Sequence, residues 1–234
     1  MMIRLFVNSD LAENVSVCAT SKQVHYLYHV MRQRVGDTVL LFNGRDGEWQ
    51  ASIKELSKKN GVFVPFVQTR EQVEENGAIL AVSLIKKDCF DLVLQKATEL
   101  GVKKIIPLIT ARTVVHQLGM ERAELIVTEA SEQCERLTLP IVEKPMQLKS
   151  FLNTYVHECS LVYLSERGQT NLSKLSSDAL CFMIGPEGGW APEEIKLFEA
   201  CQIPALNLGR LILRAETAAI GILAAHRFGN FALK

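Results

Sequence analysis

The pattern of apolar and polar residues differs before and after about residue 70. In the first part, short apolar runs alternate with tight turns rich in Gly, Asn and Asp, which predicts strands joined by hairpins. The predicted strands are residues 3–7, 38–42, 48–55 and 61–66. A helix is predicted over residues 21–34, because Val24, Leu27, Tyr28 and Met31 share one face. Closely spaced short strands are typical of a small β-barrel.

After a polar stretch at residues 69–77, predicted strands alternate with predicted helices. The strands are residues 78–85, 103–109, 161–164, 180–184 and 205–208, and the helices are 88–100, 121–136, one opening at 191–194 and one from 214. Asp88 is the expected cap of the helix that Gly101 ends. This alternation predicts an α/β fold with a parallel sheet, in which ligands bind at the carboxyl ends of the strands.

Two of these strands run into glycine-bearing loops, at residues 185–190 and 208–214. With residues 164–166, which follow another strand, the loops should surround one site. The sequence GPEGG matches neither the GxGxxG dinucleotide motif nor a Walker phosphate loop. Either loop alone is better interpreted as an ordinary strand-to-helix turn, but two such loops about two dozen residues apart favour a ligand site.

Composition narrows the class of protein only slightly. The 234 residues carry 26 basic and 26 acidic side chains, and 48% are hydrophobic, which is enough for a proper core. Residues 1–70 contain 9 Lys or Arg and 6 Asp or Glu, a net charge of +3, so the remainder has −3. This difference in net charge weakly favours binding of an anion by residues 1–70, and nucleic acid is one candidate. The residues that could contact phosphates or stack on bases are Arg32, Arg34, Arg45, Trp49, Lys58 and Lys59.

The six cysteines form no CxxC pair and no Cys/His cluster with zinc spacing, so no metal site is expected. No signal peptide and no apolar run of membrane-spanning length is recognisable. We expect a reduced, cytoplasmic protein. A solvated barrel rim remains an equally good interpretation of the basic residues named above.

Several stretches together resemble one family. They are HYLYHVMRQRVGDTVLLFNGRDGEW, DLVLQKATELGVKKIIPLITAR, EASEQCERLTLP, MIGPEGGW and LNLGRLILRAETAAI, in this order along nearly the whole chain. The chain resembles the bacterial 16S ribosomal RNA uracil-N3 methyltransferases of the SPOUT superfamily. The resemblance implies a PUA-like RNA-binding β-barrel at residues 1–70. It also implies a dimerising α/β domain at residues 71–234, with a deep trefoil knot that binds S-adenosylmethionine.

The resemblance further implies a homodimer that methylates N3 of one uridine near the decoding region of 16S rRNA, in the assembled 30S subunit. The matching motifs imply the following cofactor-binding residues: Leu164, Gly185, Pro186, Glu187, Gly188, Gly189, Leu208, Gly209, Leu211, Leu213, Glu216, Thr217 and Ala218. Leu164 would close over the adenosine, and the glycine backbone would read the adenine edge. Helix capping is an equally good interpretation of Glu216 and Thr217.

Methylation at N3 requires loss of the N3 proton and stabilisation of negative charge on O2 and O4 of uracil. Arg136 and Arg214 are the candidate cations, and Arg112 is a further candidate for RNA contact or charge stabilisation. The base could be Glu187, Glu132, Glu216 or water, since arginine stays protonated. Two other functions remain open: another SPOUT activity, such as ribose 2′-O methylation or a tRNA target, and a non-catalytic RNA-binding assembly factor.

Overall fold

The computed structural model describes residues 2–166 and 180–228, and the chain divides into two compact units. The first unit comprises Met1–Glu75 together with Ser131–Leu139, and the second comprises Asn76–Ala130 and Pro140–Lys234. The chain first passes from one unit to the other between Glu75 and Asn76, close to the boundary expected near residue 70. However, residues 131–139, expected in the larger unit, pack with the first one.

The first unit contains a five-stranded sheet in the order β1-β3-β4-β5-β2. Its strands are β1 (Arg4–Phe6), β2 (Val17–Cys18), β3 (Thr38–Phe42), β4 (Glu48–Leu56) and β5 (Gly61–Arg70). Three register shifts interrupt the β4–β5 pairing, and such irregularities bend strands and increase their twist. The sheet therefore curls around a core that includes the fully buried Leu27, Leu41 and Phe63.

The helix predicted over residues 21–34 is shorter and changes type. Helix α1 (Ser21–His25) begins with a capping box in which Thr20 accepts from the Gln23 amide and donates its own amide to the Gln23 side chain. A π-helical turn, η1 (Tyr26–Val30), follows. This wider turn shifts the phase of the helix, so Leu27 is buried whereas Met31, expected on the same face, is 40% exposed.

A buried arginine attaches residues 131–139 to the first unit. The Nε atom of Arg4 lies 2.6 Å from a carboxylate oxygen of Glu48. Its two terminal nitrogens donate to the carbonyl oxygens of Ser131 (2.9 Å) and Arg136 (2.7 Å). All three contacts are charge-assisted and buried, which makes them stronger than exposed pairs of neutral groups. The segment is thus a structural part of this unit.

The second unit is built on a parallel sheet in the order β12-β10-β11-β6-β7-β8, with β9 also paired to β7. Its strands are β6 (Ile79–Ser83), β7 (Lys104–Ile109), β8 (Ile141–Val142), β9 (Met146–Gln147), β10 (Ser160–Leu164), β11 (Leu180–Ile184) and β12 (Ala205–Leu206). Neighbouring strands in this sheet run parallel to one another. The predicted parallel α/β fold is confirmed.

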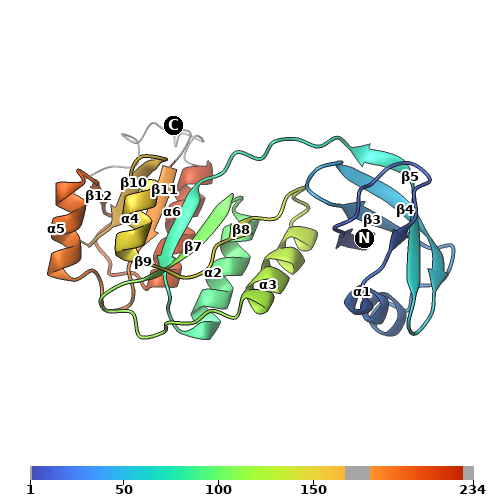
Figure 1. The fold of residues 1–234 in the computed structure, drawn as a ribbon, viewed down its shortest axis with the longest axis horizontal. Coiled ribbons are helices and arrows are strands. Elements are labelled where there is room, and N and C mark those ends of the chain that lie inside the picture. Colours follow the sequence, from blue (N-terminus) through green and yellow to red (C-terminus); the bar gives the residue numbers. More distant parts are fainter. Residues whose placement is uncertain (1, 167–179, 229–234) are drawn as a thin grey trace. The chain divides into compact units, whose positions relative to one another are not determined.

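Helices cover both faces of this sheet (Figure 1). They are α2 (Lys87–Glu99), α3 (Met120–Gln133), α4 (Leu148–Tyr155), α5 (Pro192–Ala200) and α6 (Ala215–Phe228). Alternate strand residues serve opposite faces: Leu80 and Phe182 pack in one core with α2, α3 and α6, while Ala81 and Met183 pack in the other with α4 and α5.

Two details of the predicted helices are wrong. The cap of α2 is Lys86, and Asp88 lies inside the first turn, where a carboxylate still complements the helix dipole. Helix α3 ends at Gln133, three residues before Arg136. Gly101 does follow α2 with a left-handed φ of +80°, as its predicted role requires. Among the described residues, no helix is long and apolar enough to cross a membrane.

Candidate functional site

A cavity of about 670 Å³ lies at the carboxyl ends of β10, β11 and β12. Its lining residues are Arg112, Leu164, Ser165, Glu166, Ile184, Gly185, Pro186, Glu187, Gly188, Gly189, Trp190, Pro192, Ile195, Leu206, Asn207, Leu208, Gly209, Leu211, Ile212, Leu213, Arg214, Ala215 and Ala218. All belong to the second unit. The cavity therefore lies where the strand ends predicted a ligand site, and its size is typical of small-molecule sites.

The loop after β11 is held in place by a buried tryptophan. The indole nitrogen of Trp190 donates to the carbonyl oxygen of Leu164 at 2.9 Å, which attaches the loop to the end of β10. The ring also packs edge-to-face on Phe198, with 5.0 Å between ring centroids. A Cβ atom at Gly185 would lie 3.1 Å from this ring. A side chain here would require the Trp190 ring to shift by a few tenths of an ångström, so glycine fits this close approach.

Arg112, which follows β7, is part of the same wall. Its Nη1 atom donates to the carbonyl oxygen of Gly188 at 2.6 Å. A Cβ atom at Gly188 would lie 3.4 Å from the Arg112 side chain. Within the loop, the Gly189 amide donates to the Pro186 carbonyl at 2.8 Å and closes a turn. The structure thus places Arg112 at the cavity, and its contact with RNA stays a prediction.

The loop after β12 is far more exposed. Leu211 and Ile212 are 81% and 77% exposed, although both line the cavity. Asn207 organises the start of the loop: its side chain accepts from the Gly209 amide at 2.6 Å and donates to the Glu166 carbonyl. Gly209 has a φ of +125°, which side-chain-bearing residues rarely adopt. The loop ends where α6 begins, with the Ala218 amide donating to the Arg214 carbonyl.

The structure separates the predicted charged residues into groups. Arg214 and Glu187 are exposed and line the cavity, whereas Glu216 and Thr217, in the first turn of α6, do not. Glu216 is buried and lies beside Cys89. Burial of the Cys89 thiol raises its pKa most, and the negative charge of Glu216 and a hydrogen bond to Glu216 raise it further. The positive charge of Arg214 acts in the opposite direction and lowers this pKa. The thiol is therefore neutral at ordinary pH.

Arg136 and Glu132 lie in the first unit. The Nε atom of Arg136 is 3.0 Å from a carboxylate oxygen of Glu75, and its Nη2 donates to the Thr138 hydroxyl. Glu132 accepts from the Phe6 amide at 2.9 Å. Neither residue lines the cavity of the second unit, and their predicted roles in catalysis stay predictions.

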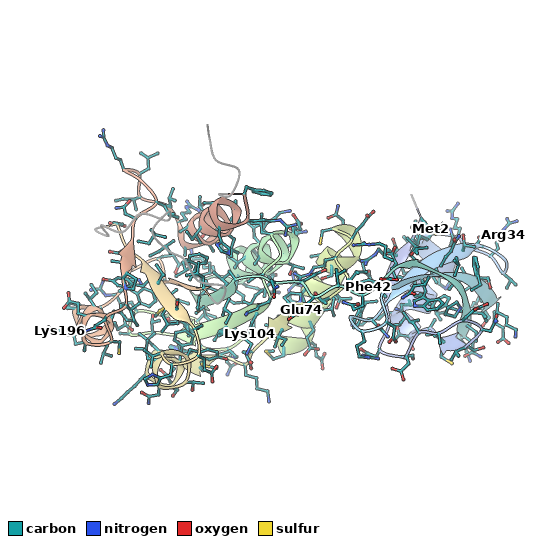
Figure 2. The ribbon with its side chains drawn as sticks, turned by 90° about the horizontal axis from the view of Figure 1, so that it is seen from above. Met2, Arg34, Phe42, Glu74, Lys104 and Lys196 are labelled. Atoms are coloured by element: carbon teal, nitrogen blue, oxygen red, sulfur yellow. The ribbon has the colours of Figure 1, made fainter. Side chains whose placement is uncertain are left out.

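The basic residues predicted to contact RNA also lie in the first unit. Arg32 and Arg34 are exposed, and Figure 2 shows the Arg34 side chain at the surface of this unit. Arg45 is half exposed and pairs with Asp10 at 2.8 Å. All three arginine side chains are accessible to RNA phosphates, and their contact with RNA stays a prediction.

Sequence reasoning assigns no role to several parts of the cavity wall, among them Trp190, Asn207, Pro192 and Ile195. Trp190 closes the GPEGGW motif, and a large aromatic residue next to a glycine loop is a signal for packing against that loop. Asn207 falls within a predicted strand, although asparagine more often organises turns. In the part of the chain that the structure describes, no group of three or more His, Cys, Asp or Glu residues could hold a metal ion.

Comparison with known families agrees with this two-unit architecture. A family model described as an RNA methyltransferase domain matches residues 73–227, and one described as an RNA methyltransferase PUA domain matches residues 19–66. The class of protein that the fold and the cavity define is therefore an RNA methyltransferase with a PUA domain. The predicted PUA-like first unit is confirmed as a fold.

Individual relatives narrow the class. The ribosomal RNA small subunit methyltransferase E of Rickettsia conorii is 37% identical over 227 residues, which cover 94% of this chain and 93% of the relative. The protein of that name from Synechocystis is 32% identical over 96% of this chain and 77% of its own length. A crystal structure of the Neisseria gonorrhoeae protein of that name, bound to S-adenosyl methionine, is 29% identical and superposes with a TM-score of 0.90 over 97% of both chains. The chain belongs to the ribosomal RNA small subunit methyltransferase E family.

Proposed function

We propose that this protein transfers a methyl group from S-adenosylmethionine to N3 of a uridine in 16S rRNA. The observation that carries the proposal is the cavity where the loops after β11 and β12 meet, in a chain of this family. The Neisseria gonorrhoeae relative, whose fold matches 97% of this chain, was crystallised with S-adenosyl methionine bound, which supports the same cofactor here.

The cavity fits this cofactor. Its wall is mostly apolar side chains and loop backbone, which suits an adenine ring because backbone N–H and C=O groups can pair with the adenine edge. At position 185 the Trp190 ring leaves little space for a side chain, so the backbone of the loop is open to a ligand there. The backbone of residues 185–189 and 208–213 would hold the adenosine, and Leu164 would cover it. When bound, the cofactor supplies a sulfonium-linked methyl group open to nucleophilic attack.

Residues of this chain would prepare the uridine. The exposed Arg214 would place its guanidinium beside a carbonyl oxygen of uracil, where negative charge accumulates as the N3 proton leaves. Glu187, also exposed at the cavity, would accept that proton, either directly or through water. Glu216 is less suited, since it is buried beside Cys89.

The remaining features of the proposal concern the partner and the assembly. Arg32, Arg34 and Arg45 of the PUA domain would contact rRNA phosphates. The substrate would be the 30S subunit in the cytoplasm, and the enzyme would act as a homodimer with a trefoil knot in its methyltransferase domain.

The deciding experiment is methyl transfer from labelled S-adenosylmethionine to 30S subunits that lack the modification. Digestion and mass spectrometry should identify N3-methyluridine. A 2′-O-methylated nucleoside would favour another SPOUT activity. Tight cofactor binding without transfer to 30S subunits or tRNA would favour an assembly factor.

The role of Arg214 can be separated from that of cofactor binding. Arg214→Ala should lower kcat about a hundredfold while changing the cofactor Kd little, because a group that acts on developing charge contributes mainly in the transition state. Lys196→Ala is the control: Lys196 is exposed on α5, away from the cavity lining, and Figure 2 shows its side chain pointing outward. An Arg214→Ala enzyme with the kcat of the control would contradict the assignment.

A further inference from the structure

Glu194, a residue that does not line the cavity, is a buried carboxylate with two separate partners. It lies in the first turn of α5 and is only 6% exposed. Its Oε2 atom accepts from the Ala191 amide, and its Oε1 atom accepts from the Ala111 amide, both at 2.8 Å. Capping α5 requires only the first of these bonds. The second bond joins residues 83 positions apart, and helix formation gives no reason for it.

The segment that Glu194 reaches is a closed turn directly after β7. The Thr110 amide donates to the Thr113 hydroxyl at 2.9 Å, and the two threonine hydroxyls are 2.8 Å apart. The Thr113 amide returns to the Thr110 carbonyl at 3.2 Å. Both threonines are buried at 6% exposure. These hydrogen bonds make the turn rigid. The bond from Ala111 to Glu194 therefore also sets the backbone position of residue 112, which follows Ala111 in the turn.

That next residue is Arg112, whose guanidinium donates to the Gly188 carbonyl. The turn is thus connected twice to one short stretch of chain, through Arg112 to Gly188 and through Ala111 to Glu194. Arg112 itself is exposed, and an exposed arginine side chain would otherwise sample many rotamers. The buried Glu194 carboxylate holds the backbone next to Arg112 in place, which restricts the positions that the Arg112 side chain can reach.

We propose that Glu194 is a positioning residue for the cofactor site: by holding the Thr110–Thr113 turn, it keeps Arg112 on the Gly188 carbonyl and fixes the shape of the glycine loop. This inference rests on the proposed function, since it assigns the loop to S-adenosylmethionine. Glu194 touches neither cofactor nor RNA and acts through Arg112.

The test uses Glu194→Gln in the full-length protein. Glutamine keeps the shape of the side chain but replaces one acceptor oxygen with a donor group, so one backbone amide loses its partner. S-adenosylmethionine affinity, measured by calorimetry, should fall about tenfold, the effect of roughly one lost charge-assisted hydrogen bond. At saturating cofactor kcat should stay unchanged, so the effect appears in the KM for cofactor. Glu193→Gln is the matched control, because Glu193 is the exposed neighbour in the same helical turn.

A double-variant cycle distinguishes positioning from a general loss of stability. In an Arg112→Ala background, Glu194→Gln should weaken cofactor binding no further, since the group it positions is gone. If Glu194→Gln folds poorly, Thr113→Val opens the same turn from its other side and should reproduce the affinity loss and its dependence on Arg112.

Equal cofactor affinities for Glu194→Gln and Glu193→Gln would overturn the inference, and so would full additivity with Arg112→Ala. A wild-type protein that binds cofactor but does not methylate uridine N3 would overturn the proposed reaction alone, because the inference is tested by binding. A wild-type protein that fails to bind S-adenosylmethionine would overturn both.

Discussion

The two glycine-bearing loops at the cavity each connect a strand to a helix, but they are built differently. The loop after β11 is attached to surrounding structure by Trp190, by Arg112 and by a turn of its own. The loop after β12 is organised mainly at its start, by Asn207, and exposes Leu211 and Ile212 to solvent. We infer from this comparison that the first loop presents a preformed surface, whereas the more exposed second loop adjusts when a ligand arrives. Preformed surfaces bind with a smaller ordering cost.

The largest loss of cofactor affinity is expected at Gly185, which packs closely against the Trp190 ring. Gly185→Val should weaken S-adenosylmethionine binding by about ten- to a hundredfold, because overpacking costs roughly 1–3 kcal/mol and the Trp190 ring would have to shift. Calorimetry measures the loss. Gly119→Val is the control, since its added Cβ would meet only Arg122, at 4.0 Å, and lies outside the cavity lining.

Gly209→Ala should weaken cofactor binding less than Gly185→Val does. A Cβ there meets no atom within 4 Å, so the cost is only that of the left-handed backbone, about 1–3 kcal/mol before the exposed loop relaxes. We expect an affinity loss of about tenfold or less by the same calorimetry. A loss as large as that of Gly185→Val would show that the second loop is as rigid as the first.

Trp190→Phe tests the attachment of the first loop. The variant removes the hydrogen bond to Leu164 and keeps an aromatic ring against Phe198. Loss of one hydrogen bond, about 1 kcal/mol, should weaken cofactor binding about fivefold. Because phenylalanine is smaller, Gly185→Ala should cost less in this background than in wild type. Independent, additive effects would mean that the ring and the glycine are not coupled.

The mobility expected of the second loop can be measured by proteolysis. Trypsin should cut after the exposed Arg210, and cofactor at twice its Kd should slow this cut about threefold, the factor by which ligand depletes the open form. Cleavage after Arg34, exposed in the first unit, is the internal control and should not respond. Equal rates at Arg210 with and without cofactor would contradict ordering of the loop by ligand.

Much of the fold is predictable because its long elements have clear periodicity. The strands Thr38–Phe42 and Leu180–Ile184 match their predicted bounds to the residue, and the alternation of strands and helices predicts the parallel sheet and the place of the cavity. Elements of two residues, such as β8 and β9, carry no measurable period and escape prediction. The π-helical turn Tyr26–Val30 is predicted as α-helix, since one turn cannot distinguish the two.

The site is predictable where function depends on backbone and much less so where it depends on distant partners. Glycine in two strand-end loops indicates both sides of the cavity. The local motif around Arg136 predicts a catalytic role, which stays a prediction, but it gives no sign that the guanidinium pairs with Glu75, a residue 61 positions away. The link from Glu194 to Ala111 is equally invisible in the sequence, because no local pattern records a contact across 83 residues.

The order of strands in the second unit also constrains how the chain reaches its native state. Strand β11 pairs with β6, so residues 180–184 insert beside residues 79–83. While the chain is being synthesised, the growing sheet must therefore hold β6 with one edge unpaired until about a hundred further residues have emerged. Contacts of such long sequence separation slow folding, and an unpaired strand edge promotes aggregation. We expect refolding of the isolated protein to be slow and concentration-sensitive, with the curled sheet of the first unit forming well before the parallel sheet closes.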